Sequence, residues 1–323
     1  MDWPIVESVA DRVRAWHVKP SLYEWMAPVS TLENSRYLDA VLFAASICHS
    51  TKGALRATYV DTRYKGWDVL LRGFVAAAED GIGPELLRDV DATSLAELVV
   101  HGGSETKVEF RDLDRRTEIV RSLARELTGY GNGISDVLQF EGDVLTAGGA
   151  GGAYERLASL SAFSDSQQKK STTFLMTVHF SGRVRMADPE SVSPMVDYHR
   201  IRLLLRLGCI RVSDELASAL RSGDSVDSDV AAHLRSAAYA ISTKMSAVSK
   251  LPELELDVLL WAFARSACRH SPVCTSQAYQ NSSFGAFTGW SASRGCPFAG
   301  VCCSEGAAIE GMFWEPIVET ENY

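Results

Sequence analysis

The run Pro194-Met195-Val196-Asp197-Tyr198-His199-Arg200-Ile201-Arg202, which continues to Leu207, decides the fold that we expect for this chain. Apolar side chains recur within it at the spacing of one helical face, at Ile201, Leu204 and Leu205, so a helix is predicted from Asp197 to about Leu207. Asp197 stands at the start of this helix, where a carboxylate can accept hydrogen bonds from unpaired backbone N–H groups. The simplest role for Asp197 is therefore that of a helix N-cap.

The same helical spacing of apolar residues continues on both sides of this run. It predicts further helices over residues 34–47, 66–79, 112–128, 154–162, 168–180, 213–221, 229–248 and 254–267. The helix over 112–128 carries Arg115, Arg116, Arg121 and Arg125 opposite its apolar side, a pattern typical of a solvated face. Strand-like alternation is confined to Lys107–Phe110, so the expected fold class is mostly α.

Composition and charge exclude several classes of protein. The 323 residues are 46% hydrophobic and 23% charged, which is ordinary for a globular protein with a sizeable core. No apolar run reaches the ~18 residues of a membrane span, and no signal-peptide core follows Met1–Pro4, so we expect no membrane partner and a cytoplasmic location. The net charge of −9 disfavours a protein that mainly grips duplex DNA and favours a small-molecule substrate.

The segment around Asp197 also carries a resemblance. Val196-Asp197, His199, Arg202 and then Arg206-Leu207-Gly208 resemble the stretch that holds the catalytic aspartate in endonuclease III-like glycosylases of the helix-hairpin-helix superfamily. The resemblance implies a two-lobed helical fold over residues 1–267, with an active cleft between the lobes. It also implies that Asp197 stabilises the oxocarbenium-like sugar formed when a base departs, as glycosidase carboxylates do.

Some members of that superfamily use a lysine on the preceding helix, and here Lys169 and Lys170 open the helix predicted over 168–180. Lys170 is the candidate catalytic lysine, and the alternative is a solvated helix terminus. The hairpin Leu-Pro-Gly-Val-Gly that normally precedes the lysine is replaced by Phe163-Ser164-Asp165-Ser166-Gln167. This departure puts conventional gripping of the DNA backbone in doubt.

A longer resemblance, over residues 36–265, is to the queuosine salvage proteins, which are nucleotide N-glycosylases. The matching segments occur in the same order, at Arg63–Trp67, Ala76–Gly81, Phe163–Asp165, Lys169–Lys170, Asp197–Tyr198, Leu207–Gly208, Val212–Leu216 and Leu260–Trp261. That family has a second aspartate near the positions of Thr177 and His179, so His179 is a candidate base or substrate donor, with a structural role as the alternative.

The same resemblance implies a set of substrate-binding side chains. Aromatic residues in the matching segments are candidates for stacking on a nucleobase, although tryptophans at helical spacing more often belong to the core. The candidates for substrate binding are Tyr64, Trp67, Tyr198, His199 and Trp261.

Five of the seven cysteines lie within residues 268–323, which in a reducing compartment indicates metal binding more than disulfides. Cys268, Cys274, Cys296 and Cys302 resemble the iron–sulfur loop of endonuclease III-like enzymes, with Cys303 as an alternative to Cys302. Four thiolates can hold a 4Fe–4S cluster or a zinc ion, and the resemblance favours the cluster. Residues 268–323 are therefore expected to form a cysteine-ligated loop and tail; simple unligated thiols are the alternative.

These patterns predict an N-glycosyl hydrolase that acts on a modified, 7-deazaguanine-type nucleoside or nucleotide. The first alternative is a base-excision glycosylase that uses DNA as its substrate and carries an iron–sulfur cluster. The second is a non-catalytic, cluster-bearing protein that binds nucleic acid or senses redox state. Asp197 discriminates between these classes, because a binding module does not need that carboxylate.

Overall fold

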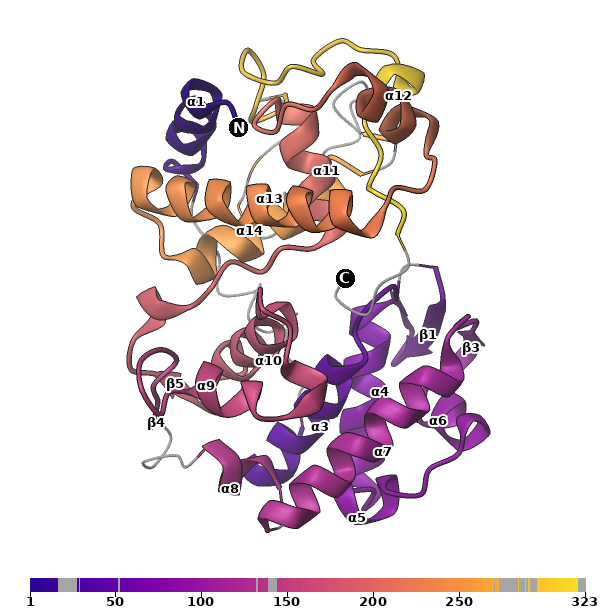
Figure 1. Cartoon of the computed structure of the whole chain (residues 1–323). Helices are drawn as coiled ribbons and strands as arrows, with labels where there is room; N and C mark the ends of the chain where they lie inside the picture. The colour runs from indigo at the N-terminus through magenta and orange to yellow at the C-terminus, as the bar shows by residue number, and fades with distance from the viewer. Residues whose placement is uncertain are drawn as a thin grey trace. The chain divides into compact units, whose positions relative to one another are not determined.

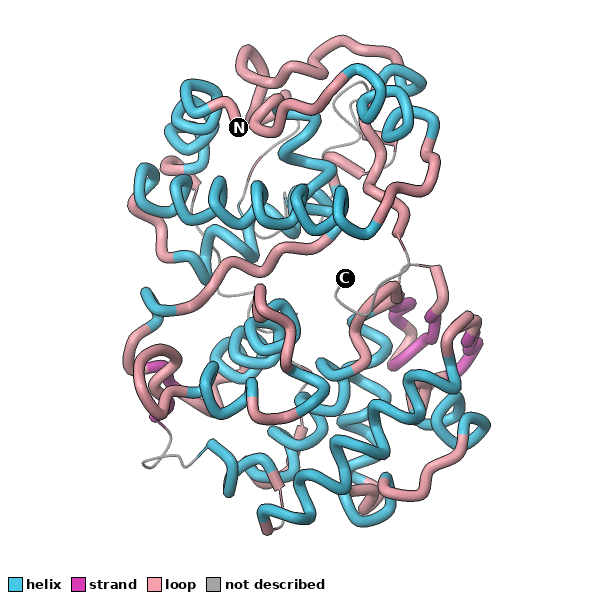
Figure 2. The backbone as a smooth tube through the Cα atoms, viewed as in Figure 1, coloured by secondary structure: helices cyan, strands magenta, loops and turns pink. Residues whose placement is uncertain are grey.

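The computed structural model describes the chain apart from residues 17–27, 29, 52, 132, 139–143, 270, 273–283, 285–287, 289, 291–294 and 319–323. Of the described residues, 55% are helical and 7% lie in strands, which confirms the mostly α class (Figure 2). The chain forms two compact units, which we describe separately. Unit 1 combines Met1–Leu22 with Val192–Thr320, and unit 2 contains Tyr23–Ser191.

Unit 2 is organised around two helices that are buried along most of their length. Ten of the 13 residues of α3 (Asn34–Ser46) are buried, as are ten of the 12 residues of α10 (Lys169–Phe180). Helix α3 packs against α10 and α4 and also contacts α7 and α8 (Figure 1). The remaining helices are α4 (Trp67–Glu79), α5 (Pro84–Leu87), α6 (Ala92–Leu98), α7 (Leu113–Tyr130), α8 (Ile134–Leu138) and α9 (Ala153–Ala158), with short 3-10 turns at Ser161–Phe163 and Pro189–Ser191.

A small antiparallel sheet completes unit 2, in the order β2-β1-β3. Strands β1 (Leu55–Tyr59) and β2 (Thr62–Lys65) form a hairpin that the sequence did not predict, whereas β3 (Ser104–Val108) overlaps the expected strand. Val60 and Asp61 form the turn, with φ angles of 45° and 62°. Such a turn usually carries Asn-Gly or Asp-Gly, so its sequence signal is missing here. A two-stranded parallel pair, β4 (Val144–Leu145) and β5 (Arg185–Met186), lies elsewhere in unit 2.

Unit 1 is a helical assembly that joins both ends of the described chain. Its helices are α1 (Trp3–Val13), α11 (Tyr198–Leu207), α12 (Asp214–Ser222), α13 (Ser228–Ser249) and α14 (Glu253–Ser266), with a 3-10 turn at Ile309–Gly311. Helix α1 packs along α13, and α11 packs against α13 and α14 (Figure 1). The described residues of the cysteine-rich segment, for which the resemblance implies a loop and tail over residues 268–323, belong to this unit.

The helix bounds expected from apolar spacing are largely confirmed, most within one or two residues. Capping residues explain the agreement: Ser213 accepts a hydrogen bond from Leu216 N and begins α12, and Asp227 accepts one from Asp229 N and begins α13. The helix expected over 154–162 is shorter, because α9 ends at Ala158 and a 3-10 turn follows. None of the described helices is both long enough and apolar enough to cross a membrane.

Candidate active-site carboxylate and its surroundings

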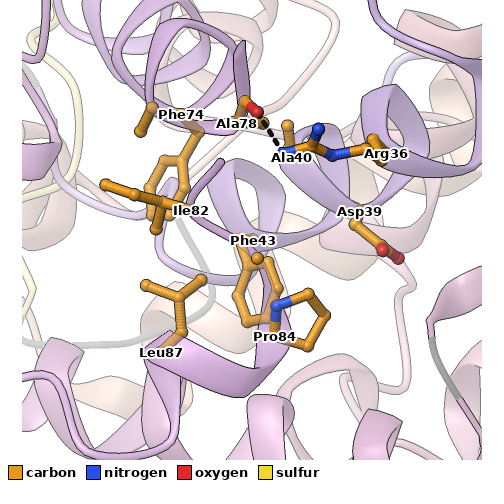
Figure 3. A pocket seen from close by; sticks show the side chains of 11 residues that line it. Arg36, Asp39, Ala40, Phe43, Phe74, Ala78, Ile82, Pro84 and Leu87 are labelled. Carbon is orange, nitrogen blue, oxygen red and sulfur yellow. Dashed lines mark hydrogen bonds between the residues drawn. The ribbon is translucent and has the colours of Figure 1, made fainter. Parts of the chain in front are cut away.

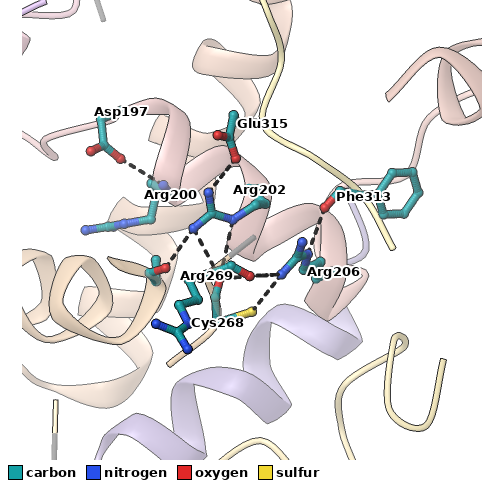
Figure 4. Close-up of polar contacts among 9 residues, drawn as sticks. Asp197, Arg200, Arg202, Arg206, Cys268, Arg269, Phe313 and Glu315 are labelled. Carbon is teal, nitrogen blue, oxygen red and sulfur yellow. Dashed lines mark hydrogen bonds and ion pairs between the residues drawn. The ribbon is translucent and has the colours of Figure 1, made fainter. Parts of the chain in front are cut away.

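Asp197 is the N-cap of α11, as its position in the sequence predicted. Its Oδ1 accepts a hydrogen bond of 2.8 Å from the backbone N–H of Arg200, and its backbone is extended (φ −115°, ψ 176°). Asp197 is only 9% exposed, and Figure 4 shows its contact with Arg200. The positive end of the helix dipole favours a negative charge at this point. The result is a carboxylate that is held in one place by the start of a helix.

Three arginines of α11 fix this helix inside unit 1, and each is 1% exposed. Arg200 pairs with the carboxylate of Asp257 on α14 and donates to Ser242 Oγ on α13 at 2.7 Å. Arg202 forms an ion pair with Glu315 and donates to the backbone carbonyl of Ala264 at 2.7 Å. Burial lowers the pKa of Arg202 to about 10.

Arg206 extends this arrangement to segments that are distant in sequence. Its guanidinium donates to the carbonyls of Arg269, at 2.6 Å, and Phe313, at 2.8 Å (Figure 4). A guanidinium has five donors in a rigid plane, so it can satisfy several backbone acceptors at once. The three arginines thereby join α11 to α13, α14 and the C-terminal segment, and they immobilise the helix that begins at Asp197.

The other predicted residues of unit 1 lie on α11 and α14. Tyr198 and His199 form the first turn of α11 and are half-buried, with ring centroids 4.3 Å apart. Trp261 lies on α14, also half-buried, under the guanidinium of Arg265 at 4.8 Å. Tyr198 and His199 follow Asp197 directly in the chain, and their role in substrate binding stays a prediction.

The structure describes three of the four cysteines that are expected to bind a metal. Cys268 Sγ lies 3.7 Å from Nη1 of Arg206, and Cys302 Sγ donates to the backbone carbonyl of the same arginine at 3.4 Å. Cys296 is half-buried, and Cys274 falls outside the described residues. Among the described residues no group of three or more His, Cys, Asp or Glu side chains is arranged to hold a metal ion. The four-thiolate centre therefore stays a prediction.

Lys169 and Lys170 occupy the start of α10 in unit 2, and both are buried, at 6% and 4% exposure. The alternative of a solvated helix terminus is therefore wrong for both side chains. Lys169 Nζ lies 3.0 Å from Cys48 Sγ. Lys170 lines a polar pocket of about 320 Å³ to which Asp165 and the hydroxyls of Ser122, Ser161 and Ser164 also contribute. Arg115 and Glu118 also line this pocket, so its two cationic side chains are accompanied by two carboxylates.

His179 lies at the other end of α10. It accepts a hydrogen bond of 3.5 Å from the backbone N–H of Met186 at Nδ1, and burial lowers its pKa. Nine residues separate it from Lys170, which is about 13 Å along a helix axis. The two side chains therefore cannot both contact the same small group, such as one phosphate.

The remaining predicted aromatic residues lie near the hairpin of unit 2. Tyr64 is in β2, with the guanidinium of Arg72 3.9 Å from its ring centroid, and Trp67 is the first residue of α4. Both are half-buried. Tyr64 already stacks on a cation, so a base would have to use its other face.

A buried polar cluster that the sequence did not reveal lies next to the lysines. Arg116 is 1% exposed, although the arginines of this helix were predicted to form a solvated face. It donates to Asp112 and to the carbonyls of Ile47 and His49, and His49 Nε2 lies 2.9 Å from Asp112 Oδ2. Burial, with Arg116 and then Lys170 nearby, lowers the pKa of His49 to about 3. No local pattern distinguishes Arg116 from Arg115, because its acceptors come from the distant segment 47–49.

We compared the chain with models of protein families and with curated protein sequences, and neither comparison gives a match.

Proposed function

We propose that this protein is an N-glycosyl hydrolase that cleaves the bond between sugar and base in a modified nucleoside or nucleotide, with Asp197 as the central carboxylate. The observation that carries the proposal is the fixed position of this carboxylate at the start of α11, whose arginines are all buried in contacts. The sequence around Asp197 resembles the catalytic segment of base glycosylases, so both sequence and geometry favour the same residue.

The chemistry requires a negative charge that does not have to move. As the base leaves, positive charge develops on the sugar ring, and an anion fixed beside the ring lowers the energy of that transition state. Asp197 has one oxygen engaged by the Arg200 N–H, so its direction is set before substrate binds. The same carboxylate can accept a proton from the water that attacks the anomeric carbon.

The distribution of charge supports a small substrate over duplex DNA. The net charge is −9, and at least seven of the 32 lysines and arginines are buried among the described residues. A protein that neutralises several phosphates needs exposed cations. Recognition of a single phosphate needs only one or two exposed cations.

We also propose that Cys268, Cys274, Cys296 and Cys302 hold a 4Fe–4S cluster or a zinc ion with a structural role. The support is the resemblance of the spacing, together with the approach of Cys268 and Cys302 to the same residue, Arg206. A bound metal would add stability to the segment that carries these cysteines. The protein residues would supply thiolate ligands and no part of the hydrolysis.

The test separates the charge of Asp197 from its role as a cap. Asparagine caps a helix about as well as aspartate, so Asp197→Asn should change the free energy of unfolding by less than about 0.5 kcal/mol. It should reduce base release by about a hundredfold or more, since it removes the fixed charge. Asp227→Asn is the matched control, because Asp227 caps α13 from an exposed position.

Base release is measured with modified mononucleotides and with lesion-bearing oligonucleotides, at several salt concentrations. Release from mononucleotides with a shallow dependence on salt is expected. Release from DNA alone, with a steep salt dependence, would show the base-excision alternative to be correct. If Asp197→Asn and the Asp227→Asn control release base at the same rate, Asp197 acts only as a helix cap and the proposed mechanism is wrong.

A further inference from the structure

Unit 2 contains a single cysteine, Cys48, whose sulfur lies beside a buried lysine side chain. Nζ of Lys169 is 3.0 Å from Cys48 Sγ and 3.5 Å from the carbonyl oxygen of the same residue. Lys169 is 6% exposed and Cys48 is 7% exposed. Among the described residues, both hydrogen-bond acceptors of this ammonium group therefore belong to Cys48.

Hydrogen bonding alone explains the burial of Lys169 poorly. A buried ammonium group usually pairs with a carboxylate, because an unpaired charge is costly away from water. Asp165 accepts a hydrogen bond of 3.3 Å from the backbone N–H of Lys169, but none of the carboxylates that the structure describes forms an ion pair with Nζ. A thiol is only a weak acceptor. The arrangement instead places a nitrogen nucleophile next to the one sulfur atom of a cysteine in this unit.

Helix α3, which leads to Cys48, is anchored near its start. There it lines a pocket of about 200 Å³ together with α4 and α5, and Arg36 donates from Nη2 to the carbonyl of Ala78 (Figure 3). One turn further along α3, Asp39 accepts a hydrogen bond of 2.7 Å from the backbone N–H of Ile134. These contacts oppose rotation and sliding of α3, so they also fix the position of its last turn.

The chain that follows α3 is held by a second buried cation. Arg116 is 1% exposed and donates to the carbonyls of Ile47, at 2.5 Å, and His49, at 2.7 Å, on either side of the cysteine. Lys169 is the first residue of α10, which packs against α3 (Figure 1). The folded unit therefore keeps sulfur and nitrogen in contact, and groups held in this way react as if they were present at very high concentration.

We propose that Cys48 and Lys169 form a covalent S–N link, a sulfenamide, when hydrogen peroxide oxidises the thiol. Peroxide converts the thiol to a sulfenic acid and is itself reduced to water. The neutral amine of Lys169 then attacks the sulfur: an S–N bond forms and the S–O bond breaks. The departing hydroxide takes the proton that nitrogen releases and leaves as a second water. Two molecules of a thiol reductant restore the amine and the thiol and end as a disulfide.

The link gives the oxidised cysteine a product that can be reduced. Unit 2 has no second thiol in its sequence, so an internal disulfide of this unit cannot capture the sulfenic acid. A sulfenic acid that is not captured is oxidised further to sulfinic acid, which ordinary thiols do not reduce. Hydrogen peroxide is small enough to reach a sulfur with little exposure. The inference concerns unit 2 alone and does not rest on hydrolysis at Asp197.

The test is a peptide map of the full-length protein after treatment with hydrogen peroxide. Catalase removes the excess peroxide, the protein is unfolded in iodoacetamide to block the remaining thiols, and trypsin digests it. We expect a linked pair of peptides, over residues 37–52 and 157–170, that is two hydrogen atoms lighter than the separate peptides together, because trypsin does not cut after a linked Lys169. Dithiothreitol should separate the pair. The same treatment in concentrated urea should give no linked pair, since unfolding removes the contact.

Two variants isolate the amine. Lys169→Arg keeps the positive charge and removes the nucleophile, so no linked pair is expected, and sulfinic acid at Cys48 should accumulate at least about tenfold faster than in the wild type. Lys170→Met removes the adjacent buried amine and is the matched control, which should link as the wild type does.

The wild-type map alone decides the question, even if a variant does not fold. The proposal is overturned if Cys48 stays a free thiol, or reaches sulfinic acid, while trypsin still cuts after Lys169. A linked pair that contains one added oxygen atom would also overturn it, because the bond would then be an N–O–S bridge. Equal yields of the linked pair in buffer and in urea would show that the folded contact is not responsible.

Discussion

Replacing Arg116 by methionine tests whether the buried polar cluster of unit 2 holds that unit together. Arg116 donates to the carbonyls of Ile47, at 2.5 Å, and His49, at 2.7 Å, and to Asp112 at 2.8 Å. Methionine keeps the aliphatic bulk and removes every donor. The two carbonyls then lose their partner in a buried region, at a cost of about 1–3 kcal/mol each. Asp112 is partly exposed, so its ion pair adds little.

The expected loss in the free energy of unfolding is therefore about 2–6 kcal/mol, which corresponds to a fall in Tm of roughly 4–24 °C. Guanidinium denaturation followed by far-UV circular dichroism measures the loss. The neighbouring Arg115→Met is the control, since Arg115 is 54% exposed and pairs with Glu118 on the surface of the same helix. It should cost less than about 0.5 kcal/mol. Equal losses in the two variants would refute the reasoning.

Three further predictions follow from other parts of the structure. Gly208→Ala should lower the free energy of unfolding by well over 1 kcal/mol, because φ at this residue is +81° and an added Cβ would meet Cys303 Sγ. Gly223→Ala is the control: φ is +76° there, but an added Cβ meets only ordinary contacts, so the free energy of unfolding should fall by about 1 kcal/mol. Urea titrations measure both losses. Burial raises the pKa of Glu253 to about 8, so the neutral carboxyl contributes stability that is fully present below pH 4.5 and is lost as pH rises through 8. The free energy of unfolding should therefore fall over this pH range, and Glu253→Gln should make that fall smaller. Anaerobically purified protein should contain iron or zinc by elemental analysis, and Cys268→Ser should lower the content; a metal-free wild type would contradict the four-thiolate centre.

Apolar spacing predicts the helices well because it records which side of each helix is buried. It predicts Asp197 as an N-cap for the same local reason, since the capping bond spans only three residues. Helix α1 was not predicted, although its buried residues Val6, Val9, Ala10 and Val13 follow helical spacing. Attention to Asp2 as a cap with Pro4 in the first turn would have located it.

The buried charges could not be predicted, because their partners are remote. Arg200 is satisfied by Asp257 and Ser242, and Arg206 by carbonyls near residues 269 and 313. A single sequence shows the arginines but not the folded segments that surround them. The pocket beside Asp39 depends in the same way on three separate segments, although the spacing of residues 36, 39, 40 and 43 was visible in the sequence.

Unit 1 is built from segments at both ends of the described chain, and this affects the order in which its helices can pack during synthesis on the ribosome. Helix α1 packs on α13, whose last residue, Ser249, follows Val13 by more than 200 residues. At ~5–20 residues per second, the apolar side of α1 waits roughly 10–50 s for its partner, while the continuous unit 2 is completed first. During that interval Val6, Val9 and Val13 lack the helix that buries them, and α1, with 11 residues, is too short to be stable as an isolated helix, so it forms only when α13 is available.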